Sequence, residues 1–124
     1  MKKIFILIAA AGLLLLSGCS RGQKTWITDL DEAQAEAAKT GKPVLIVFTG
    51  SDWNDQSKNL IENLFTPDFF ATGSKEYVLC NIDILKNTET GDPETQERNY
   101  DAANKYAIQQ LPYVVLMTTD MDIY

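Results

Sequence analysis

Two cysteines, Cys19 and Cys80, are the only thiols among the 124 residues, and the sequence contains no histidine. A thiol attacks a disulfide or binds a metal as its thiolate, and a neighbouring histidine is a frequent activator of it. Without histidine, Ser-His-Asp and Cys-His mechanisms are excluded, and two cysteines are too few for a four-ligand zinc site or an iron–sulfur cluster. We therefore predict no catalytic residue of these classes, no metal site and no cofactor.

Cys19 follows a segment with the features of an export signal. Lys2 and Lys3 precede an unbroken small or apolar run from Ile4 to Leu16, which is shorter than the roughly 20 residues of a membrane-spanning helix. Residues 16–19, Leu-Ser-Gly-Cys, resemble the lipobox of bacterial lipoproteins, whose cysteine sulfur takes a diacylglycerol. The alternative is an ordinary secretory signal or a short membrane anchor.

This pattern divides the chain into three segments. We expect residues 1–18 to be a lipoprotein signal peptide, residues 19–24 a tether lipidated on Cys19, and residues 25–124 one folded domain. The lipid on Cys19 would attach the protein to a membrane of the cell envelope, facing the periplasm. By resemblance to the sorting rule of many Gram-negative bacteria, Ser20 after the cysteine favours the outer membrane if the organism is Gram-negative.

The charge of the mature chain is strongly acidic. Of the 11 basic residues, Lys2 and Lys3 precede Cys19, which leaves nine against 17 acidic residues and a net charge of −8. Such a surface repels phosphate backbones and anionic headgroups, so we predict no nucleic-acid partner. The acidic residues over 89–97 lack the ligand spacing of an EF-hand and are interpreted as a solvated loop.

Helices and strands alternate along residues 25–124. The pattern predicts a helix capped by Asp29 or Asp31 and ending at Thr40–Gly41. The elements expected after it are a buried strand over 44–49, a turn over 50–54, a helix with its apolar face at Leu60, Ile61, Leu64 and Phe65, a strand over 77–84, a polar stretch over 86–97, a short helix around 103–108 and a strand over 113–117. Strands joined through helices form one parallel or mixed sheet, which predicts an α/β fold with its site at the turn over 50–54.

Residues 41–53, Gly-Lys-Pro-Val-Leu-Ile-Val-Phe-Thr-Gly-Ser-Asp-Trp, resemble the first strand and active-site turn of periplasmic thioredoxin-like proteins. Residues 65–69, 78–83 and 106–112 resemble the family's later segments, and the last of them leads to a cis-proline. The resemblance covers nearly the whole chain from Trp26 onward. It implies a thioredoxin-like three-layer fold, a mixed sheet flanked by helices, with Leu111–Pro112 in cis.

The chain departs from the redox members of that family at the turn. They carry Cys-x-x-Cys directly after the tryptophan, whereas this sequence has Trp53 followed by Asn54, Asp55, Gln56 and Ser57. Neither an amide nor an unactivated hydroxyl exchanges with a disulfide. The family's buried acid in the first central strand is also missing. Asn54 and Ser57 are equally suited to capping a helix, which is the structural alternative for them.

The resemblance also bears on the end of the chain. Family members continue past the strand after the cis-proline with a hairpin strand and a final helix. Here residues 118–122 would form the hairpin turn, and Ile123–Tyr124 would begin the next strand. We therefore expect a domain truncated at its C-terminus, lacking the last strand and helix.

Together these features predict a lipid-anchored, thioredoxin-fold protein without thiol–disulfide chemistry that holds a polypeptide partner. The resemblance places the peptide groove at Trp53, Leu111, Pro112 and Tyr113, although Trp53 and Tyr113 could instead be aromatics at the edge of the core. One rival is a redox protein that uses Cys80 or an intermolecular disulfide. Cys80 shares its strand face with Val78 and Ile82, which predicts a buried thiol. Another rival is a degenerate fragment without function.

Overall fold

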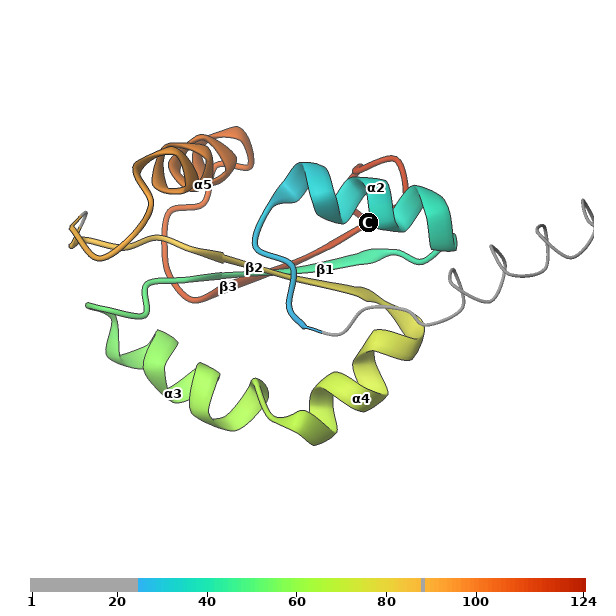
Figure 1. Cartoon of the computed structure of the whole chain (residues 1–124), viewed down its shortest axis with the longest axis horizontal. Helices are drawn as coiled ribbons and strands as arrows, with labels where there is room; N and C mark the ends of the chain where they lie inside the picture. Colours follow the sequence, from blue (N-terminus) through green and yellow to red (C-terminus); the bar gives the residue numbers. More distant parts are fainter. Residues whose placement is uncertain (1–24, 88) are drawn as a thin grey trace, which may run out of the picture.

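The computed structural model describes residues 25–87 and 89–124, which form a three-layer α/β domain (Figure 1). Cys19, the expected signal peptide and the expected tether lie outside the described residues. The elements, in chain order, are α2 (Leu30–Thr40), β1 (Val44–Thr49), α3 (Asp55–Leu64), α4 (Pro67–Glu76), β2 (Val78–Asp83), α5 (Pro93–Lys105) and β3 (Tyr113–Met117). None of the helices in these described ranges is long and apolar enough to cross a bilayer.

The three strands form one mixed sheet in the order β2-β1-β3. β1 pairs in parallel with β2 and antiparallel with β3. Helices α2 and α5 cover one face of the sheet, and α3 and α4 cover the other (Figure 1). The predicted α/β class, mixed sheet and flanking helices are therefore confirmed.

Side-chain caps fix where the helices begin. The side chains of Asp29, Asn54, Thr66 and Asp92 each accept a hydrogen bond from a backbone N–H in the first turn of the helix that follows. Gly41 ends α2 with φ at 74°, a left-handed conformation that favours glycine. The predicted bounds of α2 and β1 are correct, because both depend on such local signals.

Two helices differ from the prediction. Helix α4 was not predicted, although Thr66 as its cap and Pro67 at its first turn are local start signals. Helix α5 begins at Pro93, so part of the predicted solvated loop is helical, and Tyr106 and the two residues after it lie beyond the helix end. Its buried residues, Gln96, Asn99 and Ala102, include two amides, and a hydrophobic pattern does not reveal such a helix.

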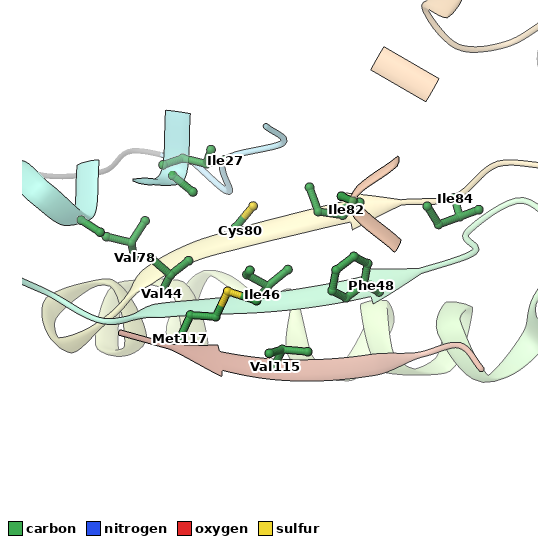
Figure 2. Packing of buried hydrophobic residues seen from close by; sticks show 13 residues of the cluster. Ile27, Val44, Ile46, Phe48, Val78, Cys80, Ile82, Ile84, Val115 and Met117 are labelled. Carbon is green, nitrogen blue, oxygen red and sulfur yellow. The ribbon is translucent and has the colours of Figure 1, made fainter. Parts of the chain in front are cut away.

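β1 lies at the centre of the core and is buried on both faces, as its continuous apolar sequence predicts. Val44, Ile46 and Phe48 point to the same side of the sheet as Cys80, toward α2 and α5 (Figure 2). Val47 has no exposed surface either. The central strand is thereby held from both sides, and its carboxyl end leads into the turn over 50–54.

Short pairings extend the sheet at both edges. Ile27 bridges to Cys80 on the outer side of β2. Beyond β3, Ile123 bridges to Met117, and the Thr118 N–H donates to the Asp122 carbonyl over 2.8 Å. The predicted hairpin turn over 118–122 is confirmed, while the expectation of a truncated domain stays a prediction.

Candidate functional site

The turn after β1 folds back on Gly50. The backbone N–H groups of Trp53 and Asn54 both donate to the Gly50 carbonyl, over 3.2 and 2.8 Å. A Cβ atom at position 50 would lie 2.6 Å from Nε1 of Trp53. Glycine is therefore needed here, because the indole of Trp53 packs directly on the backbone of residue 50.

Asn54 and Ser57, which the resemblance matches to the two cysteines of the redox motif, are both engaged in the structure of the turn. Oδ1 of Asn54 accepts from the Ser57 N–H over 2.7 Å, which confirms the capping interpretation for Asn54. Ser57 is fully buried, and its Oγ accepts from the Gly50 N–H over 2.9 Å. Ser57 thus supports the turn rather than the helix end. Asp55 and Gln56 between them are exposed to solvent.

The carboxylate of Asp83, at the end of β2, holds the first part of the turn. Its Oδ1 accepts from Oγ1 of Thr49 and from the N–H of Ser51, each over 2.9 Å. The Ser51 hydroxyl also donates to Oδ2 of Asp83. Sequence reasoning missed this carboxylate, although an acidic residue that ends a buried strand is a signal worth following.

The loop after β2 binds the second part of the turn. The Asp52 carboxylate accepts from the N–H groups of Asn87 and Lys86, over 2.8 and 3.0 Å, and these bonds hold the pKa of Asp52 below its usual value. Nε1 of Trp53 donates to the Ile84 carbonyl over 2.8 Å. The Lys86 ammonium lies 4.3 Å from the centre of the Trp53 ring. Trp53 is therefore fixed in one orientation from both sides.

An open hollow of about 260 Å³ lies between this turn and α5. Trp53 and Leu111 line it from the two sides predicted for the groove, and no charged residue lines it. Its lining also includes the aromatic ring of Tyr100 and the polar amides of Asn104, Gln109 and Gln110. These α5 and loop residues are absent from the predicted groove, because no local signal in the sequence shows that they pack opposite Trp53.

The four predicted groove residues do not form one continuous lining. The Leu111–Pro112 bond is cis, as the resemblance implied. Tyr113 lines a separate hollow along the edge of β3, together with Val114 and Ile123. Trp53 is 38% exposed and Tyr113 43% exposed, so both rings offer surface to a ligand.

Cys80 is buried, as predicted. Its side chain has no exposed surface, and burial raises the pKa of the thiol to about 12, with the negative charges of Asp29 and Glu32 as smaller causes. Within residues 25–87 and 89–124, no three His, Cys, Asp or Glu side chains gather in a way that would hold a metal ion.

Comparisons with known proteins agree on a thioredoxin-like family. A family model described as thioredoxin-like matches residues 25–119. Two curated relatives align: an uncharacterised protein of Treponema pallidum (strain Nichols), 30% identical over 113 residues and 88% of this chain, and the thioredoxin-related protein DsbJ of Chlamydia pneumoniae, 27% identical over 101 residues and 80% of this chain. These matches cover 35% and 29% of the two relatives, so the chain spans about a third of their length.

Two solved structures share the fold. DsbH oxidoreductase superposes with a TM-score of 0.71 at 16% identity, covering 82% of this chain and 71% of that one. A disulphide isomerase from Xylella fastidiosa Temecula1 superposes with a TM-score of 0.57 at 26% identity, covering 77% of this chain and 67% of that one. The first likeness, at its low identity, is one of fold alone.

Proposed function

The chain belongs to the thioredoxin-like family, and from that premise we propose that it is a lipid-anchored protein of the cell envelope that binds a polypeptide partner and does not exchange thiols with disulfides. The binding site is the hollow beside Trp53 and Leu111. The anchor is a lipid on Cys19.

One observation carries the binding function: Trp53 and Leu111, which are 58 positions apart, line the same open and uncharged hollow. A polypeptide backbone is neutral and offers both N–H donors and carbonyl acceptors. The amides of Asn104, Gln109 and Gln110 can pair with both kinds of group, and the half-exposed indole offers apolar contact. The hydrogen bonds that hold Trp53 mean that little conformational freedom is lost when a ligand binds.

The absence of redox chemistry is supported by the state of the three relevant side chains. Asn54 and Ser57 cannot exchange with a disulfide, and Ser57 is buried with its oxygen already accepting from Gly50. Cys80, the thiol on which a rival redox function would depend, is inaccessible and protonated at neutral pH. These features favour binding over catalysis.

The names of the relatives guide the choice of ligand. The solved structure that matches at 26% identity is named a disulphide isomerase, and protein disulfides join cysteines of polypeptides. We therefore favour an extended polypeptide over a small molecule. The envelope location follows from the lipobox-like residues before Cys19, and the net charge of −8 would not by itself bring the chain to an anionic membrane.

The test measures binding of an unfolded polypeptide to the full-length lipidated protein in phosphatidylcholine vesicles. The probe is an unfolded polypeptide with alkylated cysteines and a fluorescent label, followed by anisotropy. Asn104→Trp, an exposed position on α5, fills the hollow and should weaken binding by about tenfold or more, equivalent to about 1.4 kcal/mol. Glu97→Trp, also exposed on α5 but outside the lining, should not. Equal affinities for the two variants would refute the site.

A further inference from the structure

Four aromatic side chains gather where α3 ends and α4 begins, away from the turn and its hollow. The ring of Trp26 is stacked on Phe65, with centroids 4.2 Å apart and planes at 7°. Phe69 is stacked at 6.1 Å, and Phe70 is tilted at 6.4 Å. We call these four residues the aromatic cluster.

The aromatic cluster is not part of the hydrophobic core. All four side chains are only half-buried, and α4 contains no fully buried residue. An open hollow of about 360 Å³ lies against Trp26, Phe65 and Phe70, and the residues that complete its lining, Thr25, Thr66 and Pro67, are uncharged. Partly exposed aromatic rings beside an open, uncharged hollow are suited to contact with another molecule or a membrane.

The short distance in sequence between Cys19 and this hollow indicates which contact to expect. Thr25, which lines this hollow, is six residues after Cys19. Six residues, even fully extended, span at most about 20 Å. A lipid on Cys19 would therefore keep the aromatic cluster within about 20 Å of the bilayer surface.

The chemistry of the cluster suits that surface. Tryptophan and other aromatic rings partition to the interface between water and lipid headgroups. The acidic protein as a whole is repelled by anionic headgroups, but the hollow beside Trp26 has no charged lining that would oppose contact with a bilayer. We propose that the aromatic cluster docks on the surface of the anchoring bilayer, a proposal that rests on the lipid anchor of the proposed function.

Docking there would set the orientation of the domain. Helix α3 begins at the cap Asn54, beside the turn, and ends at Phe65 in the cluster. Its ten residues separate these two points by about 15 Å. The hollow beside Trp53 thus lies at the opposite end of α3 from the bilayer contact, where a polypeptide could reach it.

The two tryptophans provide a matched pair for the test. The full-length lipidated protein is placed in phosphatidylcholine vesicles that contain a lipid with a nitroxide quencher near the headgroup. Trp53→Phe leaves only Trp26 to report, and Trp26→Phe leaves only Trp53. We expect Trp26 emission to be quenched severalfold more strongly than Trp53 emission. Equal quenching of the two would overturn the proposal.

A second measurement keeps both tryptophans and avoids any damage from their replacement. An environment-sensitive fluorophore is attached at Asp68→Cys, beside the cluster, or at Glu97→Cys on α5, which covers the opposite face of the sheet (Figure 1). Buried Cys80 should not react in the native protein. We expect a blue shift on vesicles for position 68 only. The same shift at both positions would contradict the proposal. So would the absence of a shift at position 68, which would leave a protein partner as the occupant of the cluster.

The outcomes separate this proposal from the function on which it rests. A lipidated chain whose Trp26 is no more quenched than Trp53 overturns the bilayer contact and leaves the anchor and the peptide site standing. A wild-type chain that carries no lipid overturns both the anchor and the bilayer contact. The comparison of Asn104→Trp with Glu97→Trp tests the peptide site separately, because neither position belongs to the aromatic cluster.

Discussion

Oγ of Ser57 accepts a hydrogen bond from the backbone N–H of Gly50 over 2.9 Å, and both residues are buried. Ser57→Ala would leave that N–H buried without its acceptor, so we expect the free energy of unfolding to fall by about 1–3 kcal/mol. Gln56→Ala, exposed one position earlier, should change it by less than about 0.5 kcal/mol. Urea denaturation measures both. A Ser57→Ala variant as stable as Gln56→Ala would mean that the bond is not formed in solution.

The turn should support a disulfide if cysteines are restored to it. Wild-type protein should reduce insulin no faster than background, because no thiol pair is present at the start of α3. Asn54→Cys with Ser57→Cys should form an internal disulfide on mild oxidation, because the two residues lie close together in the first turn of the helix. The Asn54 side chain already reaches the Ser57 backbone, whose N–H donates to Oδ1 of Asn54 over 2.7 Å. Thiol titration and mass spectrometry check this, with Asn54→Cys alone as control. A folded double variant in which the thiols at positions 54 and 57 both stay free, in addition to Cys80, would count against the turn geometry.

Gly50→Ala tests how Trp53 is positioned. The added Cβ would lie 2.6 Å from Nε1 of Trp53, so the indole must move and lose its hydrogen bond to the Ile84 carbonyl. We expect a red shift of Trp53 emission in the Trp26→Phe background, together with weaker polypeptide binding. Gly73→Ala is the control, because its Cβ would meet nothing closer than 3.4 Å and alanine favours a helix. Unchanged emission in Gly50→Ala would show that the indole is not packed on residue 50.

Cys80 should make stability fall at alkaline pH. The pKa of the thiol is raised from 9.0 to about 12 in the folded protein, so between these values only the unfolded state releases the proton. Stability is therefore lost as pH rises above about 9, with a slope of at most about 1.4 kcal/mol per pH unit from this group. Denaturation of wild type and Cys80→Ala across pH 8–10.5 isolates the effect, since the other titrating groups are common to both. Parallel curves for the two proteins, or rapid alkylation of native Cys80, would contradict the burial.

The lipid anchor is tested by metabolic labelling with a palmitate analogue. Wild-type protein should incorporate the label, and Cys19→Ser should not, because only a thiol at that position can take the diacylglycerol. The Cys80→Ala variant serves as the control for labelling at the other cysteine and should be tagged like the wild type. Tagging that survives Cys19→Ser would remove the lipoprotein assignment.

Some features were available from the sequence because they depend on neighbouring residues. The continuous apolar run over 44–49 predicts a strand buried on both faces, and Asp29 and Asn54 are good caps for the helices that follow them. The family resemblance added the cis bond before Pro112, which composition alone could not supply. The start of helix α5 could not be placed from the sequence, because the side chains that its first turns bury include the amides Gln96 and Asn99, which carry no hydrophobic period.

What the sequence by itself determined about this protein is therefore its chemistry and its local elements: no histidine, no thiol pair at the turn, and the α/β order of helices and strands. Only the tertiary structure decided how the site is held. Asp83 reaches Ser51 across 32 positions, Trp53 meets Leu111 across one hollow, and Trp26 stacks on Phe65. Such pairs leave no periodic or local signal in the sequence. The packing of the helices on the sheet decides whether the two residues of a pair come into contact, and this packing depends on the free energy of the whole core.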